Sequence, residues 1–482
     1  VVNFIVRAGA DILKTEFNLP QGLADPSKTI IDKKGPKFDE RSKNRSIIIG
    51  KPIIDKEVHK VQILDPATGT GTFLAEVIKH IYKKFKGQEG IWSGYVDEHL
   101  LPRLNGFELL MASYAMAHLQ LDLLLKETGY KPTVTSSGVE KNQRTRVYLT
   151  NSLEEYHPDT GTFRANAIAN EANEANHIKR DTPVMCILGN PPYSGESANK
   201  GEWIMSLMED YKKEPGGKEK LNERNPKWIN DDYVKFLRYG QYYIEKNGSG
   251  VLAFINPHGF LDNPTFRGMR WNLLKTYDKI YTLDLHGNSK KKEVCPDGSA
   301  DENVFDIMQG VSINIFVKTG NKRANELGKV FHYDLFGKRD CKYDFLTNNS
   351  LKTIPYIELP NKAPNSFMVQ KNFEVEDDYN EGFSLTNLFP INNVGIVTSR
   401  DGFVIDENKQ ELENRINSFF ILEKQELLNK YNLRENKTWK IDEVKSKTKQ
   451  FNSKDLTTVT YRPFDNRCLY YNDVFIERSR SE

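Results

Sequence analysis

The sequence predicts an α/β protein with a doubly wound, mostly parallel sheet and helices on both faces, followed by a C-terminal α+β region. The first observation is that short apolar runs alternate with helical patterns from residue 61 to residue 319. The second is that polar residues follow several of these runs directly, at the strand ends where such sheets bind ligands. The third is a glycine-bearing turn that begins at Asp65 and joins a strand to a helix.

The composition is that of a chain with two or three domains and nearly balanced charge. Its 482 residues carry 68 Lys+Arg against 66 Asp+Glu, a net charge of +2. Any basic face must therefore be local. The four cysteines are far apart, which argues against a disulfide framework or a zinc site and favours a reducing cytoplasm. No apolar run approaches the length of a membrane span, and the chain opens at Val1 inside a helical pattern, so a fragment of a longer protein is expected.

The first elements lead into the glycine turn. Apolar residues at helical spacing predict a helix over residues 1–17, and 47–49 form one short candidate strand. A buried strand over 61–64 then runs into Asp65-Pro66-Ala67-Thr68-Gly69-Thr70-Gly71-Thr72-Phe73, and a helix follows to about residue 86. This is the arrangement of a nucleotide-binding unit, and a tight turn with nothing bound is the alternative. Asp65 could receive a charged amine, and Gly69 and Gly71 would allow close backbone approach to a ligand.

Two further strand ends carry candidate ligand contacts. The strand over 104–108 ends in Glu108, which could bind ribose hydroxyls or simply stabilise the start of the helix predicted over 109–125. The strand over 146–149 leads to Asn151 and Leu153, which could contact and cover a base. Taken alone, this last segment is no more than a turn.

The next strand ends in an unusual corner. The apolar run 184–188 predicts a buried strand, which the sequence Asn190-Pro191-Pro192-Tyr193 interrupts. Two prolines fix φ and remove two backbone donors, so the strand cannot continue. An amide oxygen, a proline-constrained carbonyl and an aromatic ring at a strand end together suit a planar amine.

The remaining elements of the sheet follow in order. A polar helix is expected over 163–180, and the charged segment 194–230 is expected to be an insertion or a mobile loop. Helices are predicted over 233–245 and 266–276. Further strands are predicted over 250–255, 279–285, 311–317 and 330–333. A basic loop at 289–302 contains Lys290-Lys291-Lys292.

The amino-acid composition changes from about Pro355. Three prolines mark a linker, a helix is predicted over 408–431, and 437–454 is rich in lysine. Arginines alternate with aromatic residues from Tyr461 to Tyr471. Guanidinium groups bind phosphates and rings stack on bases, so this pattern favours a nucleic-acid face. A salt-bridged domain junction explains the same residues about as well.

These motifs resemble a known family. The segment from Asp65 to Phe73 followed by Asn190-Pro191-Pro192-Tyr193 resembles the gamma-class N6-adenine DNA methyltransferases, with the cofactor motif first and the catalytic motif second. Three segments look most like the methylase region of type ISP (or type IIG) restriction–modification enzymes: Phe4–Arg7, Gly189–Gly195 and Tyr461–Asp465. Type ISP enzymes are single chains that also carry nuclease, helicase and target-recognition domains.

The resemblance implies a fold, a cofactor and a division into domains. It implies a Rossmann-like methyltransferase domain over 61–355, preceded by its N-terminal helical segment at 1–60. A linker and the start of a DNA target-recognition region follow at 356–482. S-adenosylmethionine is the implied cofactor, double-stranded DNA the implied partner, and no metal is expected. The implied cofactor-binding residues are Asp65, Pro66, Ala67, Thr68, Gly69, Gly71, Thr72, Phe73, Glu108, Asn151 and Leu153.

The implied reaction is methyl transfer to the exocyclic amine of adenine. Asn190 and the Pro191 carbonyl would accept the two amine hydrogens, Pro192 would shape the corner, and Tyr193 would stack on a flipped base. A family segment that helps to hold the cofactor would fall ahead of Val1, and no phosphate-binding loop or nuclease signature is found. Two alternatives stay open: a protein methyltransferase acting on a glutamine amide, and a non-catalytic DNA-binding fragment.

Overall fold

The computed structural model describes the chain as two separate units, 1–371 and 372–482. The described residues are 1–31, 56–133, 144–156, 167–195, 197–223, 226–323, 325–390, 395–436 and 438–479. The candidate strand at 47–49 lies outside them. Within the described ranges, no helix combines the length and the apolar character needed to cross a membrane.

A nine-stranded sheet forms the centre of the first unit, in the order β11-β10-β8-β9-β7-β6-β3-β4-β5. Strands β9 and β11 run antiparallel to their neighbours, and all other pairs are parallel. The predicted mostly parallel sheet is therefore confirmed. The strand bounds are β3 Gln62–Asp65, β4 Leu104–Glu108, β5 Arg146–Leu149, β6 Val184–Gly189, β7 Gly250–Pro257, β8 Lys279–Asp284, β9 Val311–Lys318, β10 Lys329–Asp334 and β11 Ile357–Leu359.

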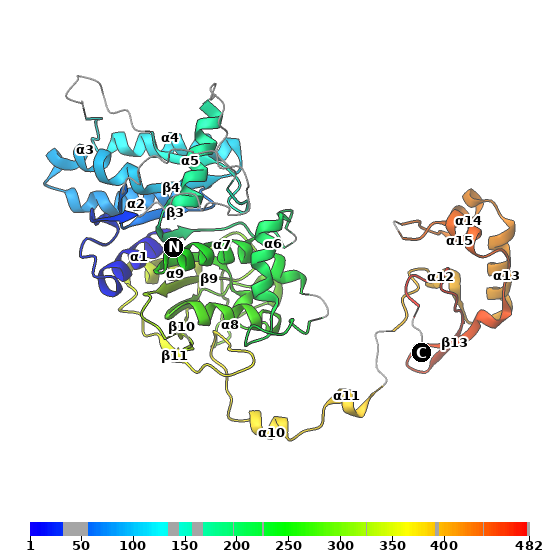
Figure 1. Ribbon diagram of the computed structural model, residues 1–482. Coiled ribbons are helices and arrows are strands. Elements are labelled where there is room, and N and C mark those ends of the chain that lie inside the picture. Colours follow the sequence, from blue (N-terminus) through cyan, green and yellow to red (C-terminus); the bar gives the residue numbers. More distant parts are fainter. Residues whose placement is uncertain are drawn as a thin grey trace, which may run out of the picture. The chain divides into compact units, whose positions relative to one another are not determined.

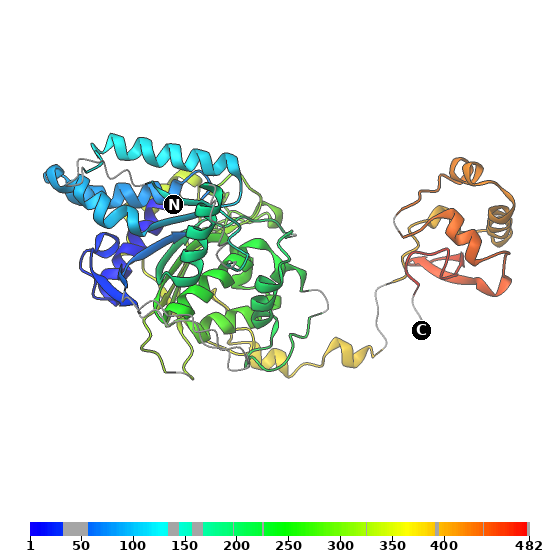
Figure 2. The same ribbon diagram turned by 45° about the horizontal axis from the view of Figure 1, so that its top comes forward.

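Helices lie on both sides of this sheet (Figure 1, Figure 2). Two hydrophobic cores cover its two faces. Strand β6 shows the division, because Cys186 and Leu188 enter one core while Ile187 enters the other. The helices of the first face are α1 Val2–Glu16, α2 Thr72–Tyr82, α4 Met111–Glu127 and α9 Arg339–Asn348. Those of the second are α5 Ala167–Asp181, α6 Glu202–Met208, α7 Asp232–Asn247 and α8 Arg267–Thr276. The short helix α3 (Trp92–Tyr95) packs Trp92 into the first core, and β1 (Lys28–Ile31) and β2 (Lys56–His59) form a separate two-stranded sheet.

The charged segment 194–230, predicted as an insertion or a mobile loop, contains a packed helix. Helix α6 lies within it, and Ile204, Met208 and Tyr211 are buried in the second core. The Tyr211 hydroxyl donates to Gln241 Oε1 at 2.6 Å. The spacing of these three residues is that of one helix face, but the surrounding lysines and glutamates masked it.

The first unit also extends beyond the predicted start of the linker at 356. Strand β11 pairs with β10, joining Val330 to Leu359. Further on, the buried Met368 donates its backbone N–H to the Leu261 carbonyl at 2.9 Å. The prolines that indicated a linker therefore lie in an ordered edge of the first unit.

The second unit contains both helices and strands, as predicted for the C-terminal region. Its sheet has the order β12-β14-β13, and Phe403, Phe419 and Phe475 lie in its core. The single helix predicted over 408–431 is wrong, because the chain forms two helices separated at Leu422. The bounds are α10 Glu376–Asn380, α11 Leu385–Leu388, α12 Asp401–Val404, β12 Ile405–Asp406, α13 Lys409–Ile421, α14 Lys424–Tyr431, α15 Ile441–Lys447, β13 Leu456–Arg462 and β14 Asp465–Tyr470.

Candidate active site

The glycine turn and the Asn-Pro-Pro-Tyr corner lie at the same edge of the sheet. Strands β3 and β6 are parallel neighbours, with Ile63 opposite Cys186. The segments that follow them, beginning at Asp65 and Asn190, therefore leave the sheet side by side at its carboxyl edge. Ligands of open α/β sheets bind at the carboxyl ends of the parallel strands, so the strand order alone predicts a binding site at this edge.

The backbone of the glycine turn approaches its neighbours closely. Gly69 and Gly71 both have positive φ, at 55° and 92°. The Thr68 backbone N–H donates to the Phe107 carbonyl on β4 at 3.0 Å, and its hydroxyl donates to the Asp65 carbonyl at 3.0 Å. After the turn, Thr72 begins α2 and Phe73 is buried.

Asp65 is the most unusual group of the site. Its side chain is 1% exposed, and Oδ1 accepts the Ala67 backbone N–H at 3.1 Å. Oδ2 is buried and has no partner among the described residues. Burial raises the pKa of this carboxyl to about 7, with a smaller contribution in the same direction from Glu108 and an opposing one from the Ala67 N–H. A buried carboxylate oxygen without a donor fits a ligand that brings one, such as an ammonium group.

Glu108, the last residue of β4, holds the glycine turn by a hydrogen bond. Its Oε2 accepts the Gly69 N–H and its Oε1 accepts the Leu110 N–H, both at 2.8 Å. A carboxylate has about four acceptor positions, so each oxygen keeps capacity for a further donor. Glu108 thus acts as a structural brace of the turn and retains acceptor capacity on both oxygens.

The loop after β5 packs against the glycine turn. Ser152 donates its hydroxyl to the Pro66 carbonyl at 2.5 Å, which ties this loop to the glycine turn. Asn151 Oδ1 accepts the Leu153 N–H at 3.0 Å, and Leu153 is buried. Lys179 of α5 donates to the Asn151 carbonyl at 2.7 Å, and burial lowers the pKa of this lysine to about 8. Neither Ser152 nor Lys179 was singled out from the sequence, because each acts through a backbone carbonyl that no motif records.

The Asn-Pro-Pro-Tyr corner, residues 190–193, which we call the acceptor corner, presents Asn190 at the surface. Asn190 and Pro192 are exposed and Pro191 is buried. The Tyr193 hydroxyl donates to Asn190 Oδ1 at 2.6 Å and lies 3.2 Å from the Ile255 carbonyl on β7. Burial raises the pKa of Tyr193, so the hydroxyl stays a donor at neutral pH. The structure therefore brings the predicted amide and ring into direct contact.

An unpredicted acid holds the segment that follows Tyr193. The two carboxylate oxygens of Asp231, at the start of α7, accept the backbone N–H groups of Ser194 at 3.1 Å and Gly195 at 3.0 Å. Asp231 is buried, and its partners lie more than thirty residues earlier in the chain. The only signal in the sequence is an acid before a helical pattern, which is far too common to single it out.

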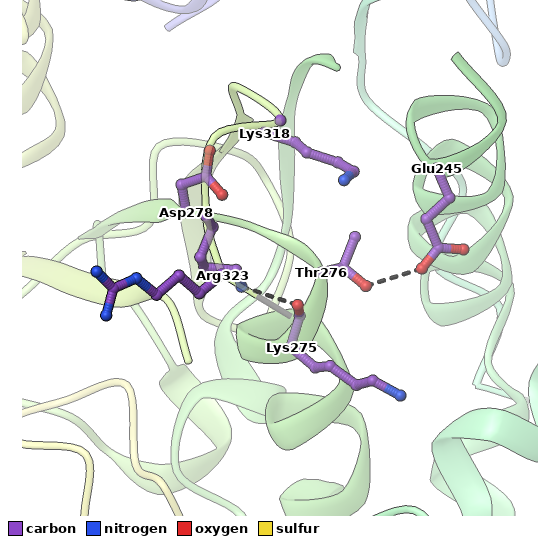
Figure 3. Close-up of a pocket in the computed structure, with 8 residues that line it drawn as sticks. Glu245, Lys275, Thr276, Asp278, Lys318 and Arg323 are labelled. Atoms are coloured by element: carbon purple, nitrogen blue, oxygen red, sulfur yellow. Dashed lines mark hydrogen bonds between the residues drawn. The ribbon is translucent and has the colours of Figure 1, made fainter. Parts of the chain in front are cut away.

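A polar cavity of about 250 Å³ lies elsewhere, at the opposite edge of the same sheet (Figure 3). Lys322 donates to the carbonyls of Leu274, Lys275 and Tyr277 at 2.7–2.8 Å, and so satisfies the end of α8. Thr276 donates to Glu245 at 2.8 Å. The polar groups that line this cavity therefore serve the end of helix α8, and none of the predicted site residues is among them.

Comparisons with known proteins agree with this arrangement. Residues 106–290 match the family model of the Eco57I restriction-modification methylase. Residues 387–482 match that of the Type ISP C-terminal specificity domain. No curated protein matches the sequence.

Three solved structures share the fold over 99% of this chain. The ATP-dependent Type ISP restriction-modification enzyme LlaBIII bound to DNA has a TM-score of 0.67 at 22% identity, and this chain covers 30% of it. A nuclease-deletion mutant of the Type ISP enzyme LlaGI, in complex with a DNA substrate mimic, has 0.65 at 21% identity and 37% coverage. The DrdV–DNA complex has 0.61 at 23% identity and 43% coverage. The chain thus spans less than half the length of each of these proteins.

The fold and the first match define the class: the first unit contains a restriction–modification methylase domain. The second match specifies the type. The chain combines an Eco57I-type restriction–modification methylase domain with a Type ISP C-terminal specificity domain. The predicted resemblance to type ISP enzymes is confirmed.

Proposed function

We propose that this chain transfers a methyl group from S-adenosylmethionine to the exocyclic amine of adenine in duplex DNA, as part of a restriction–modification enzyme. The observation that carries the proposal is that two polar side chains able to accept from a ligand lie at neighbouring strand ends, at one edge of the sheet. Asp65 offers a buried oxygen without a donor, and Asn190 offers an exposed amide on the adjacent strand end. The first suits an ammonium group and the second a planar amine.

The cofactor would lie along the glycine turn. S-adenosylmethionine supplies an activated methyl group on a sulfonium. Asp65 Oδ2 would accept its ammonium, Glu108 would accept from the ribose hydroxyls, and Gly69 and Gly71 would let the backbone approach. The fixed positions of Asn151 and Leu153 would define the side occupied by the base. Pro66, Ala67, Thr68, Thr72 and Phe73 shape the turn and the start of α2.

The acceptor base would be held by Asn190 and the Pro191 carbonyl. An exocyclic amine is a weak nucleophile, because its lone pair is delocalised into the ring. Two acceptors aimed at its hydrogens would favour the tetrahedral nitrogen that develops during transfer. Asn190 Oδ1 accepts from the Tyr193 hydroxyl, and its second lone pair can accept from an arriving base. The Tyr193 ring would then stack on the base, which must leave the duplex to reach this corner.

The DNA partner is proposed from the second unit and from the restriction–modification class. A specificity domain follows the methylase domain in the chain. LlaBIII and LlaGI were solved with DNA or a DNA mimic, and LlaGI carries a nuclease. We extend DNA binding and a nuclease part to the protein containing this chain. From the resemblance to type ISP enzymes we add a helicase part in the same polypeptide and a place in the bacterial cytoplasm.

Methyl incorporation tests the proposal. The chain is incubated with methyl-labelled S-adenosylmethionine and a mixture of long duplex DNAs, and the DNA is digested to nucleosides. Label in N6-methyladenine is the expected result. Label in protein glutamine would replace this proposal with the glutamine methyltransferase, and cofactor binding without any transfer would favour a non-catalytic fragment.

Two substitutions assign the roles of the acceptor corner. Asn190→Ala is expected to reduce methylation by roughly 10²–10³-fold, the range found when one transition-state hydrogen-bond partner is removed. Tyr193→Ala removes the stacking ring, worth about 1–3 kcal/mol per base, and should reduce methylation by roughly 10–100-fold. Calorimetry should show unchanged cofactor affinity for both. Tyr193→Phe is the control that keeps the ring and removes the hydroxyl, and it should retain most of the activity. Normal turnover in Asn190→Ala would contradict the assignment.

A further inference from the structure

A short basic loop at the carboxyl end of β8 is closed at its base by a pair of the buried His286 and the partly exposed Glu293. His286 Nδ1 lies 2.9 Å from Glu293 Oε1, and the other oxygen of Glu293 accepts the Asn288 backbone N–H at 2.9 Å. His286 itself has a positive φ of 52°. Residues 287–292 therefore form a loop whose two ends are held together.

The base of this loop is fixed from a second segment. Gly287 donates its N–H to Asp301 Oδ2 at 2.6 Å, and its carbonyl accepts from Asn303 Nδ2 at 3.1 Å. Gly287 has a positive φ of 80°, and a Cβ there would lie 2.4 Å from the Asn303 Cα. The Asn288 side chain reaches His258 Nε2 at 3.3 Å. The loop is thus braced by residues of the β7 end and of the segment before β9.

The His286 cluster is closed by its own hydrogen bonds. The second ring nitrogen, Nε2, lies 2.9 Å from Asp334 Oδ1, and Phe336 stacks on the ring with centroids 3.7 Å apart. Burial lowers the pKa of His286, but hydrogen bonds to Asp334 and Glu293 outweigh it and raise the pKa to about 10. An imidazolium donates from both nitrogens and has no lone pair for a metal. Although His258, His286 and Glu293 are close enough to bind a cation, the cluster is already satisfied as a structural bracket.

The tip of the loop carries three consecutive exposed lysines, Lys290, Lys291 and Lys292. The Asn288 side chain accepts the Lys291 backbone N–H at 3.2 Å, so the tip has a defined backbone. Within the described part of the chain, none of the three forms an ion pair. Lys212 and Lys213, by contrast, pair with Glu209 and Asp210 one helical turn away. A rigid loop that presents three unpaired cations is suited to a polyanion.

The loop lies at the same sheet edge as Asn190. The register places Gly189 opposite Phe254, and Ser312 opposite both Asn256 and Asp284. The ends of β6 and β8 are thus separated by β7 and β9. Three interstrand spacings of about 4.8 Å give a separation of roughly 14 Å along the edge. Duplex DNA carries a phosphate charge about every 1.7 Å of its axis, so a duplex held over Asn190 would bring several phosphates to this distance.

We propose that Lys290, Lys291 and Lys292 form a backbone-phosphate contact for duplex DNA beside the acceptor corner, held in place by the His286–Glu293 bracket. This inference rests on the proposed function, because it takes DNA as the substrate. The contact positions the duplex and reads no sequence, since lysines on phosphates give affinity and orientation. It belongs to the methylase unit and is independent of the specificity domain.

The test is the salt dependence of DNA binding. Affinity of the whole chain for a fluorescein-labelled duplex of mixed sequence is measured by anisotropy over a series of salt concentrations. The variant replaces Lys290, Lys291 and Lys292 with Ala. Each phosphate contact contributes about 0.9 to the slope of log affinity against log salt, so loss of two or three contacts should lower the slope by about 2–3.

A matched variant removes the same charge from the opposite edge. Lys83, Lys86 and Lys126 are exposed, and they follow or end helices α2 and α4, which return to the amino edge of the sheet. Changing these three to Ala should leave the slope unchanged. S-adenosylmethionine affinity should be normal in both variants. Equal slopes in the loop variant and the unchanged chain would overturn the phosphate contact alone, while an unchanged chain without affinity for the duplex would overturn the proposed function as well.

Discussion

Two buried ionisable side chains at the carboxyl edge of the sheet differ in their hydrogen-bond partners. At one corner, Asp65 has an oxygen with no donor, and burial raises its pKa to about 7. At the other, His286 has a carboxylate on each ring nitrogen and a phenyl ring on its face. Both groups are at most about a tenth exposed, so the difference lies in their partners and not in their depth.

This difference separates a ligand site from a structural bracket. A buried polar group without a partner costs free energy, and in a native protein it calls for an explanation such as an absent ligand. A buried group with every position filled has no capacity for one. The comparison thus supports the proposed ligand binding at the Asp65 corner and indicates loop support at the His286 corner, although His286 is the residue close to several potential metal ligands.

The largest expected effect is the loss of stability on breaking the bracket. His286→Ala removes the cation shared by the partly exposed carboxylates of Glu293 and Asp334. The loss of these two hydrogen bonds to charged groups should lower the free energy of unfolding by about 3 kcal/mol. Asp65→Asn keeps the acceptor for the Ala67 N–H and removes a buried charge, so it should change stability by less than about 1 kcal/mol. Urea unfolding followed by tryptophan fluorescence measures both, since only Trp439 of the five tryptophans lies outside the first unit. Equal losses would contradict the comparison.

The bracket should also give the first unit a defined pH dependence. The folded pKa of His286 is raised to about 10 from an unfolded value near 6.5, so its contribution is complete below about 6.5 and is lost as pH rises through 10. For Glu293, burial raises the pKa, but His286 outweighs it and lowers the pKa to about 2, so its contribution is lost as pH falls from about 4.5 towards 2. The unfolding temperature of the unchanged chain, measured against that of His286→Ala, should differ most between about pH 4.5 and 6.5. A difference that grows above pH 8 would contradict this assignment.

A smaller effect is expected from filling the space behind the glycine turn. A Cβ on Gly106 would lie 2.6 Å from the Thr68 hydroxyl and 2.9 Å from Leu74 Cδ1. Gly106→Ala should therefore cost about 1–3 kcal/mol of stability and weaken cofactor binding, because the turn must shift. Gly94→Ala is the control, since a Cβ there meets nothing within 4 Å and the residue lies in α3. The two variants can be compared by urea unfolding and by calorimetry with S-adenosylmethionine.

The sequence was sufficient for the sheet and for the adjacency of the two motifs. Apolar runs ended at Asp65, Glu108 and Asn190, and parallel strand order brought these ends together. Short-range patterns determine such features, so they can be predicted from one sequence. The role of each cofactor residue stays a prediction.

What could not be predicted depends on partners distant in the chain. Asp231 holds the backbone after Tyr193, and Lys179 holds the Asn151 carbonyl, through contacts that no local pattern encodes. The buried face of α6 was masked by surrounding charge. The break at Leu422 was missed because the two helices share one continuous polar and apolar composition, and only the Glu423 capping box shows where the second begins.

The most direct test of the central claim is the pH dependence of S-adenosylmethionine binding by calorimetry. In the proposed site, Asp65 would bind the ammonium only when it is ionised. With a pKa of about 7, its ionised fraction rises roughly tenfold between pH 6 and pH 8. The account predicts a matching roughly tenfold gain in affinity for the unchanged chain and a weak, pH-independent affinity for Asp65→Asn. The same affinity and the same pH profile in both proteins would contradict it.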